Sequence, residues 1–183
     1  MEKPGQQSAR RMLSAATCIV AAVLLAAVGG SVGCRKGGKE GGAPSEAARV
    51  PPYPAGLSAQ SSPEEVVRVL IRALEEEDEL TLQGLVAVKA EVEAVKGIYS
   101  KYGRKSELGP AEVASITAAG WALTYGFFQP GQTAIESAEV QGDTARVFLA
   151  GKRGDGKPAS LKVELLREDG LWKVRAGLKS TDR

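Results

Sequence analysis

The stretch that decides the fold is residues 132–177, QTAIESAEVQGDTARVFLAGKRGDGKPASLKVELLREDGLWKVRAG. Polar and apolar residues alternate in four runs within it, at about 132–140, 143–150, 159–167 and 171–177. This period of two is typical of half-buried β-strands, and the Gly, Asp and Pro residues between the runs are typical of turns. Because the connections are short, the stretch predicts a four-stranded antiparallel meander.

The alternation gives this predicted sheet one apolar face. The positions that we expect on the inner face are Ala145, Val147, Leu149, Leu161, Val163 and Leu165, together with Trp172 and Val174 on the last strand. An apolar sheet face has to be covered by other elements. On the opposite face Phe148 and Leu166 stand at otherwise polar positions, which makes that face a candidate surface for homodimerisation.

The residues that cover the sheet precede it in the chain. Ser62 is expected as an N-cap, Pro63 as the first helical residue, and Glu65 as the third residue of a capping box. The apolar residues that follow at three- and four-residue spacing are Val66, Val67, Leu70, Ile71 and Leu74. Further helices are predicted at about 80–88, at 90–101 and from Pro110 through Tyr125, so the fold class is α+β, with N-terminal helices packed on a curved, cone-like sheet.

The N-terminus has the three parts of an export signal. Residues 1–11 carry positive charge, Met12 to Val32 contain no charged side chain, and Cys18 to Val28 has the length of an apolar signal core. The small residues before Cys34 resemble the lipobox of bacterial lipoproteins, in which the signal is removed before the cysteine and the thiol receives diacylglycerol. The resemblance implies a signal peptide over 1–33 and a domain held outside the cytoplasm, in the cell envelope, by lipidated Cys34.

Two other outcomes remain open for this segment. About 20 uncharged residues are enough for an uncleaved transmembrane anchor. The second open outcome is ordinary signal-peptide cleavage that releases the protein without a lipid, since Ser31 stands where lipoproteins usually have Leu.

Composition divides the rest of the chain. Residues 34–61 are rich in Gly, Pro, Ala and Ser and predict a flexible tether. The folded domain is expected over 62–177, and residues 178–183 are expected as a disordered tail. Both cysteines of the chain lie at or before Cys34, so the predicted domain has no thiol for a disulfide, for catalysis or for a metal.

The charged residues exclude several functions. The chain has 24 Lys and Arg against 22 Asp and Glu, and it has no histidine. Without a basic stripe, binding to nucleic acid has little electrostatic support. The missing histidine removes the commonest general base near neutral pH and the commonest metal ligand. We therefore expect no metal, no cofactor and no catalytic residues.

Three motifs connect these elements to a known superfamily. They are Ser62-Pro63-Glu64-Glu65-Val66-Val67, Gly142-Asp143-Thr144-Ala145-Arg146-Val147 and Asp169-Gly170-Leu171-Trp172-Lys173-Val174. With the helices-then-meander order, the chain resembles the nuclear transport factor two-like (cystatin-like cone) superfamily, and within it small bacterial lipoprotein domains. The resemblance implies a bent sheet wrapped around helices with a pocket. Some members are isomerases or dehydratases that use Asp, His or Tyr there, but the inner positions predicted for this chain are all apolar.

The expected function is that of a non-enzymatic, lipid-anchored envelope domain that binds a protein partner or a small hydrophobic ligand. Aromatic side chains that could line the mouth of the cone are Tyr99, Tyr102, Trp121, Tyr125, Phe127 and Phe128. Alternatively, these six residues serve only in the packing of the core and of its edge. Two other functions stay open, a cone-fold isomerase or hydrolase with a tyrosine as acid, and a homodimerisation module.

Overall fold

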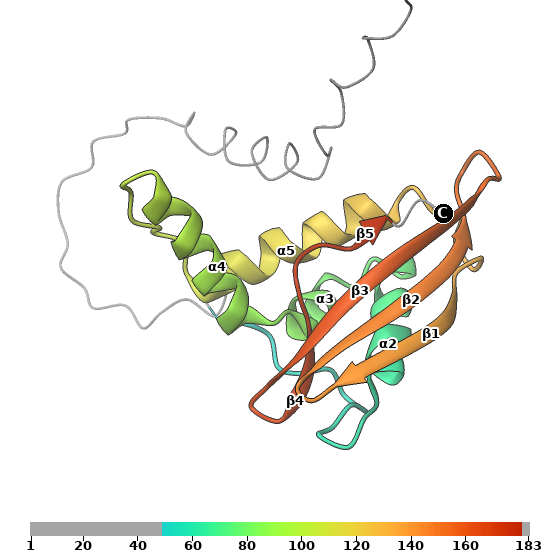
Figure 1. Ribbon diagram of the computed structural model, residues 1–183, viewed down its shortest axis with the longest axis horizontal. Helices are drawn as coiled ribbons and strands as arrows, with labels where there is room; N and C mark the ends of the chain where they lie inside the picture. Colours follow the sequence, from blue (N-terminus) through green and yellow to red (C-terminus); the bar gives the residue numbers. More distant parts are fainter. Residues whose placement is uncertain (1–48, 181–183) are drawn as a thin grey trace, which may run out of the picture. The chain divides into compact units, whose positions relative to one another are not determined.

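The computed structural model describes residues 49–180 of the 183-residue chain, and the predicted signal peptide, Cys34 and the first part of the tether lie outside them. Within these described residues, four helices precede the sheet (Figure 1). They are α2 (Pro63–Glu75), α3 (Glu79–Leu85), α4 (Val88–Lys101) and α5 (Pro110–Tyr125). The strands are β1 (Ala134–Gln141), β2 (Thr144–Lys152), β3 (Pro158–Glu168), β4 (Leu171–Val174) and β5 (Lys179–Ser180).

The sheet is antiparallel with the strand order β1-β2-β3-β4, and β5 pairs with β3 beyond the end of β4. Asp169 and Gly170 both have positive φ in the tight turn between β3 and β4, which is the backbone that a two-residue hairpin needs. A curved, open sheet with helices packed on one face confirms the predicted α+β class (Figure 1).

Helix α2 begins where the sequence predicts, with Ser62 as its N-cap. The Ser62 hydroxyl accepts a hydrogen bond from the backbone N–H of Glu65, and the Glu65 carboxylate accepts one from the N–H of Ser62. This capping box satisfies donors that a helix start leaves free. Before α5, the Glu112 carboxylate accepts from the N–H of Gly109 in the same way.

The core lies between the helices and one sheet face. α2 contacts β1, β2 and β4, while α3 packs against α2 and α5. All six predicted inner positions of β2 and β3 are buried, as are Trp172 and Val174. The alternation along the strands therefore identified the covered face correctly, whereas Phe148 and Leu166 on the other face are half-buried.

The folded part begins earlier and ends later than expected. Within the predicted tether, Val50, Tyr53 and Leu57 pack against the core, and the Tyr53 hydroxyl donates to the carbonyl of Trp172 over 2.8 Å. At the other end Leu178 is buried and leads into β5. Linker-like composition did not reveal these contacts because a few apolar side chains among Pro and Gly suffice to hold a segment on a surface.

Candidate binding groove

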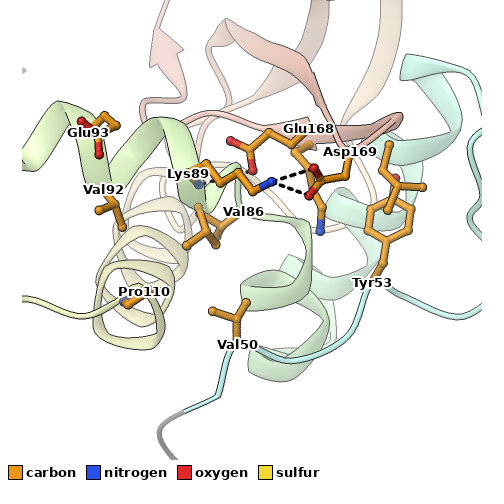
Figure 2. A pocket seen from close by; sticks show the side chains of 12 residues that line it. Val50, Tyr53, Val86, Lys89, Val92, Glu93, Pro110, Glu168 and Asp169 are labelled. Carbon is orange, nitrogen blue, oxygen red and sulfur yellow. Dashed lines mark hydrogen bonds and ion pairs between the residues drawn. The ribbon is translucent and has the colours of Figure 1, made fainter.

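A groove of about 570 Å³ opens between α4, the β3–β4 turn and the segment around Tyr53 (Figure 2). Its lining contains both apolar and charged side chains, called here its floor and its rim. The apolar lining residues are Val50, Val86, Val88, Val92, Pro110 and Leu171, and the others are Tyr53, Lys89, Glu93, Glu168, Asp169 and Lys173. The groove is open to solvent and is not an enclosed cavity.

The near wall of the groove is the first turn of α4, and a carboxylate from β3 holds it in place. Ala87, at the N-cap position, has no side chain that could cap the helix. The Glu168 carboxylate accepts hydrogen bonds from the N–H groups of Ala90, over 2.9 Å, and Lys89, over 3.3 Å. A negative charge at a helix N-terminus also interacts favourably with the helix dipole. Glu168 thus has a structural partner and is not a free carboxylate in the groove.

The second rim carboxylate is also paired. Lys89 Nζ lies 2.6 and 2.8 Å from the two carboxylate oxygens of Asp169, as Figure 2 shows. This hydrogen bond and the charge of Asp169 raise the pKa of Lys89 above its ordinary value. Glu93 pairs with Lys96 on the same helix over 2.8 Å.

The far wall joins β4 to the N-terminal segment. Lys173 Nζ donates to the carbonyl of Gly84, near the end of α3, and lies 4.4 Å from the centre of the Tyr53 ring. Burial lowers the pKa of Lys173, and burial also raises the pKa of Tyr53 to about 12. The Lys173 ammonium satisfies a carbonyl that the end of α3 leaves free. Burial of the two side chains, and not this hydrogen bond, is the cause of both pKa shifts.

Residues that lie beside the groove also cover the outer edge of β4. The N–H of Ala87 donates to the carbonyl of Val174, and Val86 forms a parallel bridge with Val174. With the Tyr53 bond to Trp172, these contacts occupy the backbone groups that an added strand would use. A partner in this groove would therefore contact side chains.

The six predicted pocket residues are not gathered at either of the two grooves described for the structure. Trp121, Tyr125 and Phe128 are buried in the core, and the rings of Tyr125 and Phe128 stack with centroids 5.9 Å apart. Tyr102 and Phe127 are exposed, and Tyr99 is half-buried on α4. Which of these rings face inward depends on how α4 and α5 pack, and their residue types carry no such information.

One tyrosine does lie beside a carboxylate. The Tyr125 hydroxyl donates to Glu75 over 2.9 Å and lies 3.0 Å from the hydroxyl of Thr133, while Glu75 also accepts from the N–H of Gly131. Burial, more than these hydrogen bonds, raises the pKa of Tyr125 to about 12. The bonds join the ends of α2 and α5 to the loop before β1, and neither groove includes them, so the arrangement is that of a structural cluster.

A second groove, of about 800 Å³, lies on the other side of the Pro-rich segment. It shares Val50 and Tyr53 with the first groove and is otherwise formed by residues 49–55 together with Leu80, Thr81 and Gln83. The sequence signal for both sites was weak, since Tyr53 is an isolated aromatic residue in a segment with linker composition.

Within residues 49–180, no group of three or more His, Cys, Asp or Glu side chains is arranged to hold a metal ion. None of the helices in this part of the chain is long and apolar enough to cross a bilayer. Cys34 lies outside the described residues.

Comparison with solved structures finds two similar chains. A crystal structure from Campylobacter jejuni, provisionally described as an NTF2-like transpeptidase, is 18% identical; the match covers 64% of this chain and all of that one, with a TM-score of 0.39. A de novo designed protein with a curved β-sheet is also 18% identical, over 65% of this chain and 88% of its own, with a TM-score of 0.32. The first is described as NTF2-like, the class that the sequence resembles. No protein-family model and no curated protein matches the chain.

Proposed function

We propose that this chain is a non-enzymatic, lipid-anchored binding domain of a bacterial envelope, and that the groove beside α4 receives an extended segment of a protein partner. The observation that carries the proposal is the apolar floor of the groove, formed by partly exposed side chains such as Val88, Val92 and Leu171 beside the charged residues of the rim. Exposed apolar surface of this kind marks interaction sites in soluble domains.

The shape of the groove favours a protein segment over a small hydrophobic ligand. Small-molecule sites usually enclose most of the ligand surface. Here the groove is open to solvent, so a small apolar molecule would keep part of its surface in water. A chain segment with two or three apolar side chains can cover the floor while its backbone stays solvated.

The rim charges indicate what the partner segment contributes. Lys89 and Asp169 neutralise each other, Glu93 pairs with Lys96, and Glu168 caps α4. Because these charges already have partners, affinity would come mainly from apolar contacts with the floor. The same pairing argues against the enzyme alternative, since general acid–base chemistry needs a titratable group within reach of a bound substrate.

The anchoring part of the proposal rests on the sequence. Positive residues, an uncharged apolar core and small residues before Cys34 are the features that export and lipid attachment require. A domain tethered outside the cytoplasm would meet its partners among other envelope proteins.

The test is a peptide screen on the full chain. Peptides selected from a random library would be measured by fluorescence anisotropy against the wild type, against Val92→Glu in the groove, and against Ile98→Glu as a matched control. Ile98 is an exposed apolar residue of the same helix and does not line the groove. We expect Val92→Glu to weaken binding at least tenfold and Ile98→Glu to leave it unchanged, with both variants retaining the wild-type circular dichroism spectrum.

Peptides that bind all three proteins equally would refute the groove as the site. If no peptide binds but an apolar fluorescent dye does, and Val92→Glu removes that signal, the small-ligand alternative would replace the partner proposal.

A further inference from the structure

Helix α5 carries apolar residues on every side, and Glu112 in its first turn is its one charged residue. From Val113 to Tyr125 it contains no charged residue. One side of it belongs to the core, and the buried residues there are Val113, Ala114, Ala118, Trp121 and Tyr125. A helix at the surface of a domain normally carries polar residues on its other side, whereas a helix that is apolar all round is normally covered all round.

The outward side of α5 is a stripe of apolar residues in solvent. Ile116 is 45% exposed and Leu123 is 62% exposed, and Phe127, just after the helix, is 65% exposed. These positions follow each other at seven and four residues, which places them on one side of a helix. Ala119 and Gly120 lie between the two larger aliphatic residues of this outward α5 stripe.

Within residues 49–180, no packing contact explains why position 120 is a glycine. A Cβ atom added there would meet nothing within 4 Å, and its backbone is helical. Glycine inside a helix is less favourable than alanine by about 1 kcal/mol. Small residues at the centre of a helix surface allow the backbone of another helix to approach closely. The outward α5 stripe therefore has the form of a helix–helix contact surface.

We propose that a second copy of this chain covers the outward α5 stripe, with the two α5 helices antiparallel about a two-fold axis beside Ala119 and Gly120. Ile116 and Leu123 lie three residues on either side of this pair, so the axis places Ile116 of each copy against Leu123 of the other. A two-fold contact requires such a self-complementary surface. The one charged residue of α5 is Glu112, in its first turn, so the two Glu112 side chains lie at opposite ends of the antiparallel contact and no like charges oppose each other. The proposal is independent of the groove.

A membrane surface fits the stripe less well. Helices that lie on membranes carry Lys and Arg beside a broad apolar face. α5 itself has neither residue, and the centre of its stripe is Ala119 and Gly120, which offer little apolar area to lipid.

The size of the surface predicts a weak dimer. A helix of 16 residues is about 24 Å long and about 10 Å wide. Stable interfaces bury about 800 Å² on each partner, more than one helix face provides. The contact should therefore exchange rapidly, and covalent trapping is a better test than the size of the protein in dilute solution.

The experiment uses the full chain in membranes of the expressing cells, with a short bismaleimide as cross-linker. Ala119→Cys places a thiol beside the proposed axis, and Val140→Cys is the matched control because Val140, on β1, is 57% exposed. The chain without an added cysteine gives the background from Cys18 and Cys34. We expect at least fivefold more cross-linked dimer from Ala119→Cys than from Val140→Cys, and loss of that excess when Leu123→Glu or Gly120→Leu is added.

Three results would overturn the proposal. Equal cross-linking of the two cysteine variants would show random encounters. A product of different mass would show another protein on the stripe. Absence of dimer, combined with protection of Ala119→Cys from a water-soluble maleimide only when phosphatidylglycerol vesicles are added to the purified protein, would assign the stripe to a lipid surface. Thermal unfolding of Leu123→Glu and Gly120→Leu at temperatures no lower than that of the wild type would show that both variants fold.

Discussion

At the scale of single residues, Gly84 shows how closely the N-terminal segment lies on the domain. A Cβ atom at Gly84 would lie 2.5 Å from the backbone carbonyl oxygen of Pro52, and a backbone atom cannot rotate away. We therefore expect Gly84→Ala to lower the free energy of unfolding by about 1 to 3 kcal/mol, as overpacking does. Gly97→Ala, on α4 with nothing within 4 Å, should raise it by about 0.5 to 1 kcal/mol. Urea denaturation measures both, and equal effects would contradict the close packing at Pro52.

Tyr53 predicts a dependence of stability on alkaline pH. Its pKa in the folded protein is raised by burial to about 12, from 10.0 for an unperturbed tyrosine. Because the folded state favours the protonated phenol, this contribution to stability is fully present below pH 10 and is lost as the pH rises toward 12. The wild type should lose stability more steeply over this range than Tyr53→Phe, in urea denaturation at a series of pH values. Parallel loss in the two proteins would mean that Tyr53 is solvated.

At the scale of elements, α4 depends on a cap from another part of the chain. Glu168 accepts from the first N–H groups of α4, and Ala87 supplies no cap. Glu168→Ala should lower the free energy of unfolding by about 1 kcal/mol, the usual value for a lost cap. Amide hydrogen exchange should quicken in the first turn of α4. This result would also show that the groove wall is held by β3.

The matched change is Asp169→Asn, which removes the exposed ion pair with Lys89 and keeps a residue that tolerates the positive φ at this position. We expect almost no change in stability, because exposed ion pairs contribute little. If Asp169→Asn destabilised the protein as much as Glu168→Ala, the turn as a whole, and not the cap, would be the source of the effect.

At the scale of the whole molecule, the anchor proposal makes a prediction about the mature chain. Protein extracted from membranes should begin at Cys34 and carry the added mass of diacylglycerol. Cys34→Ala should lose that mass and keep the N-terminal residues, because the lipid-dependent cleavage requires the cysteine. Intact-mass spectrometry of both proteins measures this. A wild-type chain that retains residues 1–33 would indicate a transmembrane anchor, and a different start without lipid would indicate secretion.

The sequence by itself determined the helices and the four main strands. The capping box at Ser62 and the alternation along β2 and β3 are local signals, and each reports both the type of element and the side that is buried. These signals hold because a helix repeats every 3.6 residues and a strand every two, whatever the rest of the chain does.

Only the tertiary structure decided which residues far apart in the sequence are in contact. The Tyr53 bond to Trp172 spans 119 residues and the Lys173 bond to Gly84 spans 89. No periodicity relates such distant residues. The composition of the segment before α2 therefore predicts only a tether, and the sequence does not predict the groove. The six aromatic residues were separated for the same reason, since packing between helices, and not residue type, placed Trp121 in the core and left Tyr102 in solvent.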